Sequence, residues 1–269
     1  MKKSTFILLI ILFPIASLLV KGEHITDWLN YTEYFKKAEE LSIIEFINYT
    51  PHLEVGFDLF VLLLAKLRLP SISLLFFSIY LVLYMLAYSM NISAKKNITI
   101  IFILIIICTD YPLISILDNT LRQNIALGIC TLGIFHSKRW FLLAPFFHIS
   151  SIGYIGMYII SKTRLGIWFI LGLFIFRNDI NLLFSNYTHQ LYDPPSTNFM
   201  ILLGISTAFL FFIKHDLRKL AMVFFLTILL IYPTTQISSR FVLYGHLFVI
   251  IAFINFLLSP NNNGKTINI

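Results

Sequence analysis

The chain has 269 residues, of which 58% are hydrophobic and only 12% are charged, and its formal net charge is +7. This small number of polar residues could not cover the surface of a water-soluble globule. The composition therefore argues against a soluble domain. The basic residues stand in small clusters between apolar runs instead of along one face, which argues against a nucleic-acid surface and favours the positive-inside pattern of a membrane protein.

Apolar runs recur along the whole chain, and several approach the length of roughly 20 residues that spans a membrane as a helix. The sequence therefore predicts an all-α polytopic membrane helix bundle, with about 8 to 10 transmembrane or re-entrant helices. No internal repeat is visible, so residues 1–269 are expected to form one domain. The apolar runs cover residues 5–20, 71–90, 98–108, 121–135, 140–160, 165–176, 199–213, 220–231 and 241–258.

The run at residues 5–20 follows Lys2 and Lys3, and we interpret it as a first membrane span because no signal-cleavage site follows it. Cys108 and Cys130 lie inside apolar runs, without the spacing of a disulfide framework or a metal site. The sequence therefore predicts packing cysteines, no metal site and no cofactor.

Residues 53–69 form a short apolar stretch that carries Glu54 and Asp58 near its start and stops at Pro70. Its length and its charges favour a hairpin or an interfacial helix over a full span.

A second interrupted stretch covers residues 140–160, with Pro145, His148, Ser150 and Ser151 at its centre. This pattern predicts a broken helix that lines a protein-enclosed cavity. At membrane depth an ionisable group is a functional candidate, and His148 has the chemistry to exchange a proton or to bind phosphate oxygens when charged. A hydrogen-bonded packing histidine is the alternative.

The basic clusters set the expected topology. Two arrangements place all of these clusters on the cytoplasmic side. In the first, the interrupted stretches 53–69 and 140–160 are both re-entrant. In the second, 140–160 crosses the membrane and 165–176 is re-entrant. In both cases residues 118–123, 177–198 and 236–240 lie on the outer side. The clusters are Lys2 and Lys3, Lys95 and Lys96, Lys138 and Arg139, Lys162 and Arg164, and Lys214, Arg218 and Lys219.

The segment "DNTLRQNIAL", residues 118–127, predicts the start of a helix, because Thr120 and Gln123 fit a capping box. Arg122 is unfavourable there, since a cation in the first turn faces the positive end of the helix dipole. A bound anion would reverse this, because free N–H groups and a planar guanidinium would both point at it. The alternatives are that Arg122 reaches the membrane interface or pairs with Asp118 or Asp110.

Arg240 leads another apolar helix, with Tyr244 one turn later, and two arginine-headed helices on the outer side suggest a diphosphate. The alternative is a solvated helix end. Ala126, Cys130 and Gly133 form a small-residue face that predicts close helix packing.

These residues resemble the EpsG branch of the Wzy-type polysaccharide polymerases. "DNTLRQNIAL" is similar to the N-x-x-R-Q-x-x-A signature of that branch, and "SKRWFLLAPFFHISS" resembles its basic loop and following histidine. "HLEVGFDLF" looks like the E-P-G-aromatic element, with Val55 in place of the proline, and "SSRFVLYGHLFVIIAF" resembles the late arginine-bearing segment.

The resemblance implies a metal-independent glycosyltransferase, multi-pass in the bacterial inner (cytoplasmic) membrane, that polymerises oligosaccharide repeat units linked to undecaprenyl diphosphate. The product would be O-antigen, capsule or exopolysaccharide, and chain-length regulator and flippase proteins would be partners. From the residues themselves we expect Arg122, His148 and Asp118 to be catalytic. Asp118, which lies one turn before Arg122, or His148 would be the base. Substrate-binding residues would be Gln123, Arg240, Glu54 and Tyr244.

Two other functions fit an arginine-lined cavity. A lipid-linked oligosaccharide flippase should show repeat symmetry between its halves, and none is visible. A membrane acyltransferase would need a second His or Arg cluster on the cytoplasmic side, and the sequence has none that we can identify.

Overall fold

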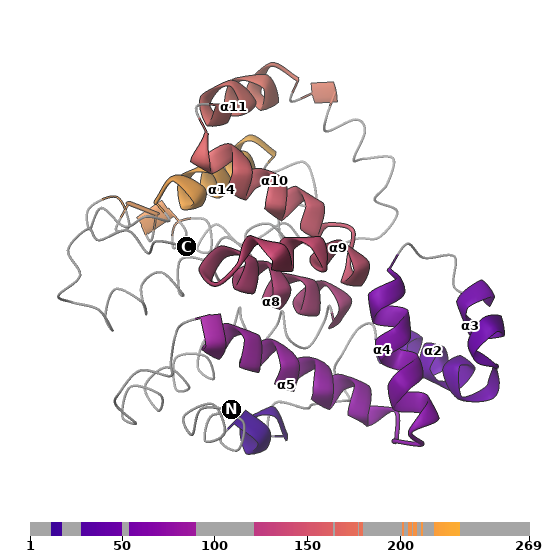
Figure 1. The fold of residues 1–269 in the computed structure, drawn as a ribbon. Coiled ribbons are helices and arrows are strands. Elements are labelled where there is room, and N and C mark those ends of the chain that lie inside the picture. Colours follow the sequence, from indigo (N-terminus) through magenta and orange to yellow (C-terminus); the bar gives the residue numbers. More distant parts are fainter. Residues whose placement is uncertain are drawn as a thin grey trace. The chain divides into compact units, whose positions relative to one another are not determined.

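The computed structural model describes residues 12–17, 28–49, 54–89, 121–163, 165–176, 178–179, 201, 204–205, 207–208, 211 and 218–231. Within these ranges all regular secondary structure is helical, which confirms the all-α expectation (Figure 1). None of the described helices is both long enough and apolar enough to cross a membrane. Contacts group the chain into one unit of Met1–Tyr154 with Ile269 and another of Ile155–Asn268, and the single domain stays a prediction.

Residues 12–17 are helical, within the run at 5–20 that the sequence predicts to be a helix, and three short helices follow: α2 (Trp28–Glu40), α3 (Ile43–Tyr49) and α4 (Val55–Lys66). The sequence analysis predicted no helix within residues 21–52, where α2 and α3 lie. A capping box begins α3, since Ser42 N–H donates to Glu45 at 2.8 Å and Glu45 N–H donates to Ser42 Oγ at 3.3 Å. α2 packs against α4 and positions its tyrosines beside it.

Helix α4 has 12 residues, as expected for a stretch too short to be a full span. Its carboxyl end is a Schellman motif, because Leu69 N–H donates to Leu64 O at 3.3 Å and Arg68 N–H donates to Ala65 O at 2.9 Å. Arg68 takes the left-handed position of that motif with φ of 56°, and Pro70 then follows.

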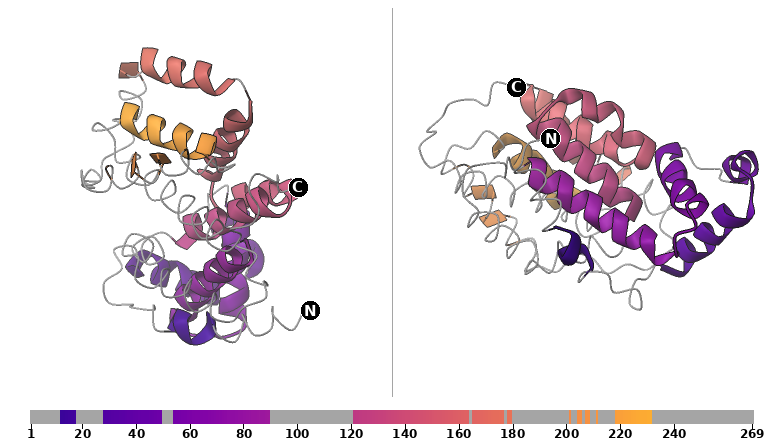
Figure 2. Two further views of the ribbon diagram at one scale, coloured as in Figure 1. Left: turned by 90° about the vertical axis from the view of Figure 1, so that its left-hand side faces the viewer. Right: turned by 60° about the horizontal axis from the view of Figure 1, so that its bottom comes forward.

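Among the described helices, α5 (Ile72–Ser89) and α8 (Leu121–Phe135) pack most extensively and lie side by side (Figures 1 and 2). A Cβ added at Gly128 would lie 2.5 Å from Met85 Cε, so the glycine permits this close approach. Ala126, Cys130 and Gly133 are buried, with Gly133 against the Phe141 ring, which confirms the packing expected for this face.

The stretch at 140–160 is broken, as predicted. A short 3₁₀ helix η2 (Lys138–Leu142) leads to α9 (Ala144–Phe147), and α10 (Ser151–Lys162) begins after a non-helical break at 148–150. α9 packs against α8 and α4, so the break lies beside the beginnings of both helices. In the second unit, α11 (Leu165–Ile175) contacts α14 (Arg218–Ile231).

Candidate functional site

Arg122, in the first turn of α8, forms an ion pair with Glu54, the residue that precedes α4. The Nη1 atom of Arg122 lies 2.7 Å from Glu54 Oε2. Glu54 is only 7% exposed, whereas one third of the Arg122 side chain (33%) remains accessible. A carboxylate so buried requires compensating donors, and the guanidinium supplies a charged one. Arg122 therefore pairs with Glu54, a partner that the sequence analysis did not name, and Asp118 and Asp110 lie outside the described residues.

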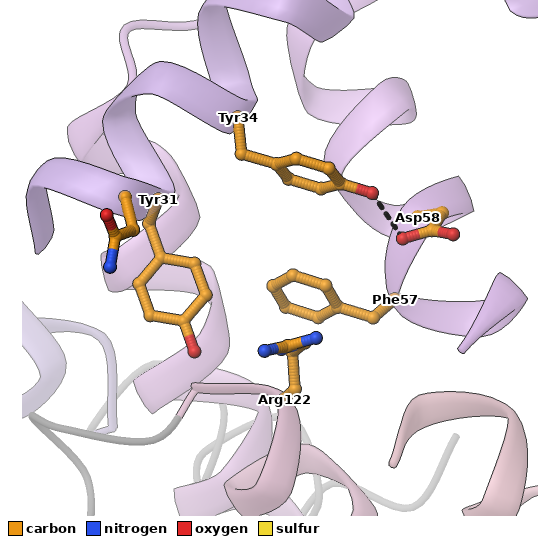
Figure 3. A pocket seen from close by; sticks show the side chains of 6 residues that line it. Tyr31, Tyr34, Phe57, Asp58 and Arg122 are labelled. Carbon is orange, nitrogen blue, oxygen red and sulfur yellow. Dashed lines mark hydrogen bonds between the residues drawn. The ribbon is translucent and has the colours of Figure 1, made fainter. Parts of the chain in front are cut away.

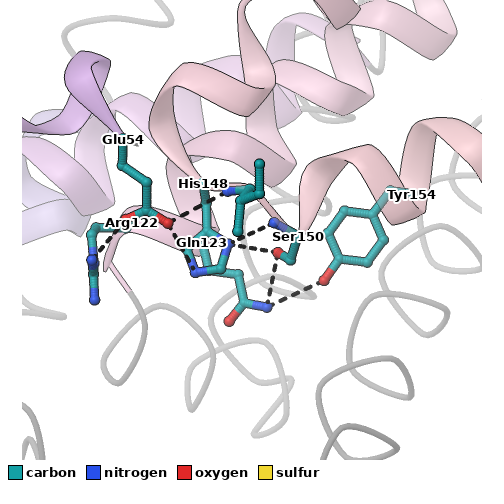
Figure 4. A network of polar contacts seen from close by, with 7 residues as sticks. Glu54, Arg122, Gln123, His148, Ser150 and Tyr154 are labelled. Carbon is teal, nitrogen blue, oxygen red and sulfur yellow. Dashed lines mark hydrogen bonds and ion pairs between the residues drawn. The ribbon is translucent and has the colours of Figure 1, made fainter. Parts of the chain in front are cut away.

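The break between α9 and α10 supplies further donors to the same carboxylate. Ile149 N–H donates to Glu54 Oε1 at 3.4 Å, and His148 Nε2 lies 3.7 Å from that oxygen (Figure 4). The break places backbone N–H groups outside a helix, where they need other partners. The break therefore presents the His148 ring and one backbone N–H group to Glu54.

Hydrogen bonds at the other ring nitrogen fix the tautomer of His148. Ser150 N–H donates to His148 Nδ1 at 3.1 Å, and the Ser150 hydroxyl lies 2.7 Å from the same atom. A backbone N–H can only donate, so Nδ1 is the acceptor and the proton of the neutral ring resides on Nε2, on the side of Glu54.

Gln123 continues this network from α8. Its Nε2 atom donates to the Tyr154 hydroxyl at 3.2 Å and lies 3.5 Å from Ser150 Oγ (Figure 4). The residue is 3% exposed. The capping role predicted for Gln123 involves Thr120, which lies outside the described residues.

A close backbone approach holds Glu54 in this place. A Cβ added at Gly56 would lie 2.9 Å from Phe146 O and 3.1 Å from Phe147 Cδ2. Only glycine allows the first turn of α4 to come so near to α9, which carries His148 at its end.

A pocket of about 130 Å³ lies on the other side of Arg122 (Figure 3). Tyr34 donates a short hydrogen bond to Asp58, and the Arg122 guanidinium carbon lies 6.0 Å from the centre of the Phe57 ring. Asp58 is 5% exposed. The pocket is lined by Asn30, Tyr31 and Tyr34 of α2, Phe57 and Asp58 of α4, and Arg122.

The structure brings together Glu54, Arg122, Gln123 and His148, which the sequence analysis selected as site residues from distant segments. Asp118, Arg240 and Tyr244 lie outside the described residues, so their places in the site stay predictions. In the described part of the chain, no group of three or more His, Cys, Asp or Glu side chains is arranged to hold a metal ion.

The sequence analysis noted Asp58 only as a charge that argues against a span, and it selected neither Tyr31 nor Tyr34. The available signal was an acidic residue four positions after Glu54, a spacing that places both residues on the same side of one helix start. Nothing in the sequence indicated the tyrosines, because residues 21–52 carry no strong apolar period.

No curated protein and no solved structure matches the chain. The family model of the EpsG family matches residues 5–268. Because this match covers nearly the whole sequence and includes Glu54, Arg122 and His148, the protein described here belongs to the EpsG family.

Proposed function

We propose that the protein is a membrane glycosyltransferase that joins lipid-linked oligosaccharide repeat units into a surface polysaccharide. Membership of the EpsG family supports a role of the polysaccharide-polymerase type and a membrane location. The proposed donor is a growing chain on undecaprenyl diphosphate, and the proposed acceptor is a second lipid-linked unit. The proposed place is the outer face of the bacterial inner membrane.

One observation carries this proposal. Arg122 lies in the first turn of α8, is held on one side by Glu54, and borders a pocket on the other side. The helix N-terminus and the exposed part of the guanidinium offer donors to an anion at the same point. A lipid diphosphate is the anion that a polymerase of this type must release.

In the proposed reaction, a hydroxyl oxygen of the acceptor sugar attacks the anomeric carbon of the donor sugar. The bond from that carbon to the diphosphate oxygen breaks, and the electron pair leaves on the lipid diphosphate. The hydroxyl proton passes to a base, for which Asp118 remains our candidate. Arg122 stabilises the charge that develops on the leaving group, an effect commonly worth about 3 to 4 kcal/mol in active sites.

We propose supporting roles for the neighbours of Arg122. Glu54 holds the guanidinium, and the Nε2–H tautomer of His148 orients Glu54. The Nδ1 lone pair of His148 accepts hydrogen bonds from Ser150, so this arrangement favours a positioning role for His148 over a role as base.

Deletion of the protein in its host, followed by gel sizing of the surface polysaccharide, tests the proposed function. Loss of a polymerase should leave single repeat units on the lipid or on the lipopolysaccharide core. Loss of a flippase would leave no exported unit, and loss of an acyltransferase would leave full-length polymer without its acyl groups. Either of these last two outcomes would contradict the proposal.

A further inference from the structure

We propose that the pocket between α2, α4 and α8 binds the sugar unit that is attached directly to the lipid diphosphate. This inference rests on the proposed function, because it takes the diphosphate to be the ligand of Arg122. It adds a sugar subsite and assigns residues to it: Asp58 and Asn30 for the hydroxyl groups, and the rings of Tyr31, Tyr34 and Phe57 for the faces of the sugar.

The size of the pocket fits a ligand of this class. One water molecule needs roughly 10 to 15 Å³ of cavity volume. The pocket offers about 130 Å³, which exceeds the need of a single bound water about tenfold and suits a single sugar ring.

The burial of Asp58 supports a ligand that donates hydrogen bonds. This carboxylate lies in an apolar helix, is only 5% exposed and lines the pocket, and burial of a carboxylate is costly without donors. The Tyr34 hydroxyl supplies one donor and fixes the orientation of the carboxylate. Sugar hydroxyls that enter the pocket would add donors to the same group, and hydrogen bonds to a charged acceptor are the stronger ones.

The two charges of the pocket restrict the ligand further. Figure 3 shows the Phe57 ring between the Tyr34–Asp58 pair and the Arg122 guanidinium. Arg122 would repel a cationic ligand, and Asp58 would repel a ligand that is anionic throughout. A ligand that is neutral and rich in hydroxyls at the Asp58 side, and anionic at the Arg122 side, satisfies both. A sugar whose anomeric carbon carries a phosphate has this distribution.

The aromatic side chains complete the match. Tyr31 and Phe57 lie with their ring centres 6.0 Å apart at an angle of 62°. A sugar ring has an apolar face of C–H groups that packs on aromatic rings, while its rim of hydroxyls needs polar partners. Pockets with aromatic walls and a few placed polar groups are the usual form of small-molecule sites.

The test measures binding of two probes to the purified full-length protein in lipid nanodiscs. One probe is undecaprenyl diphosphate without sugar, and the other is the lipid-linked repeat unit extracted from a host strain that lacks this protein. The wild-type protein should bind the glycosylated probe more tightly. Asp58→Asn should weaken binding of the glycosylated probe about tenfold or more, while binding of the bare lipid diphosphate stays the same.

Tyr34→Phe provides a second variant should Asp58→Asn not fold, and we expect it to weaken only the glycosylated probe, by about threefold to tenfold. Glu45→Gln in α3 and Tyr84→Phe in α5 are matched controls outside the pocket and should bind both probes as the wild type does. Equal binding of both probes by the wild type, or an unchanged preference in both pocket variants, would overturn the sugar subsite. Failure of the wild type to bind either probe would instead overturn the proposed function.

Discussion

Arg122 occupies a position that is unfavourable for a cation unless an anion is nearby, because the N-terminus of a helix carries partial positive charge. The structure supplies one anion, Glu54, from a residue 68 positions earlier in the chain. The pair does not use the whole guanidinium, since a third of the side chain stays accessible at the pocket (33%). A local structural role for Arg122 and a role in binding diphosphate are therefore compatible, and experiments must separate them.

The double variant Glu54→Gln with Arg122→Ala makes this separation. Arg122→Ala alone leaves Glu54 buried without its charged partner, which should lower the free energy of unfolding by roughly 1 to 3 kcal/mol, between the values for exposed and buried pairs. Adding Glu54→Gln removes the unpaired charge and should restore much of this loss. We expect the polymer to stay short in gel sizing all the same, because the guanidinium that binds the diphosphate is missing.

Arg122→Lys is the matched control, and it should recover only part of the polymer length, because it keeps the charge but not the planar fork. Polymer of wild-type length in the double variant, at an unchanged protein level, would reduce Arg122 to a structural partner of Glu54.

His148 should act through Glu54 and not as the base. His148→Gln keeps an N–H donor that can reach toward Glu54 and should retain most of the turnover on lipid-linked repeat units, within about tenfold. His148→Ala removes the donor and should lose more. A general base contributes roughly a hundredfold or more, so an equal loss of that size in both variants would contradict the positioning role and restore His148 as base.

At the scale of elements, the contact of α4 with α9 determines where Glu54 lies. Gly56→Ala would place a Cβ 2.9 Å from a backbone oxygen, Phe146 O, which cannot rotate away as a side chain could. We expect the thermal stability of the purified protein to fall by the equivalent of roughly 1 to 3 kcal/mol, the range for overpacking. Polymerisation should fall further, because Glu54 moves away from Ile149.

The control is Gly156→Ala in α10, where an added Cβ meets nothing within 4 Å. A glycine inside a helix costs roughly 0.5 to 1 kcal/mol relative to alanine, so this variant should be as stable as the wild type or slightly more so. If Gly56→Ala behaves like this control, the close approach is not what places Glu54.

Sequence reasoning predicted several of these elements for physical reasons that are local. Residues 72–89, 121–135, 165–175 and 218–231 are helical where apolar runs predicted helices. The break at 148–150 follows from a proline, a histidine and two serines in an apolar stretch. α2 and α3 were missed, because they are stabilised by packing on α4 and by the Ser42–Glu45 cap more than by an apolar period.

The site was predicted in part for the same reason. Arg122 and His148 can each be recognised from the sequence, because placing an ionisable residue in an apolar run costs free energy. The pairing of Glu54 with Arg122 joins segments that share no sequence period, so only the tertiary structure shows it. The fixed tautomer of His148 likewise depends on backbone geometry at the helix break, which no residue pattern specifies.

At the scale of the whole molecule, the topology stays a prediction that the basic clusters motivate. We expect Lys95, Lys138 and Lys214 on the cytoplasmic side, and Asn119 and Asn186 outside. Single cysteines at these positions, in a background with Cys108→Ala and Cys130→Ala, should react with an impermeant reagent on intact cells only at 119 and 186. Lys138 is exposed in the structure, so a cysteine there would be reachable from its own side.

Labelling of permeabilised cells is the control, and it should modify position 138 as well. Reaction at 138 but not at 186 in intact cells would reverse the topology and place the site on the wrong face for an outer-face polymerase.

Turnover of lipid-linked repeat units by the purified protein in lipid nanodiscs tests the central claim most directly. The measurement follows two products together, a ladder of lengthened oligosaccharides and the undecaprenyl diphosphate released with each bond formed. The wild-type protein should release one undecaprenyl diphosphate for each bond counted in the ladder. The double variant Glu54→Gln with Arg122→Ala should form these bonds and release the diphosphate at least about a hundredfold more slowly, the scale of losing a group that stabilises the leaving charge. Full-length wild-type protein that binds the lipid-linked units yet produces neither product, or a double variant that produces both at the wild-type rate, would contradict the account.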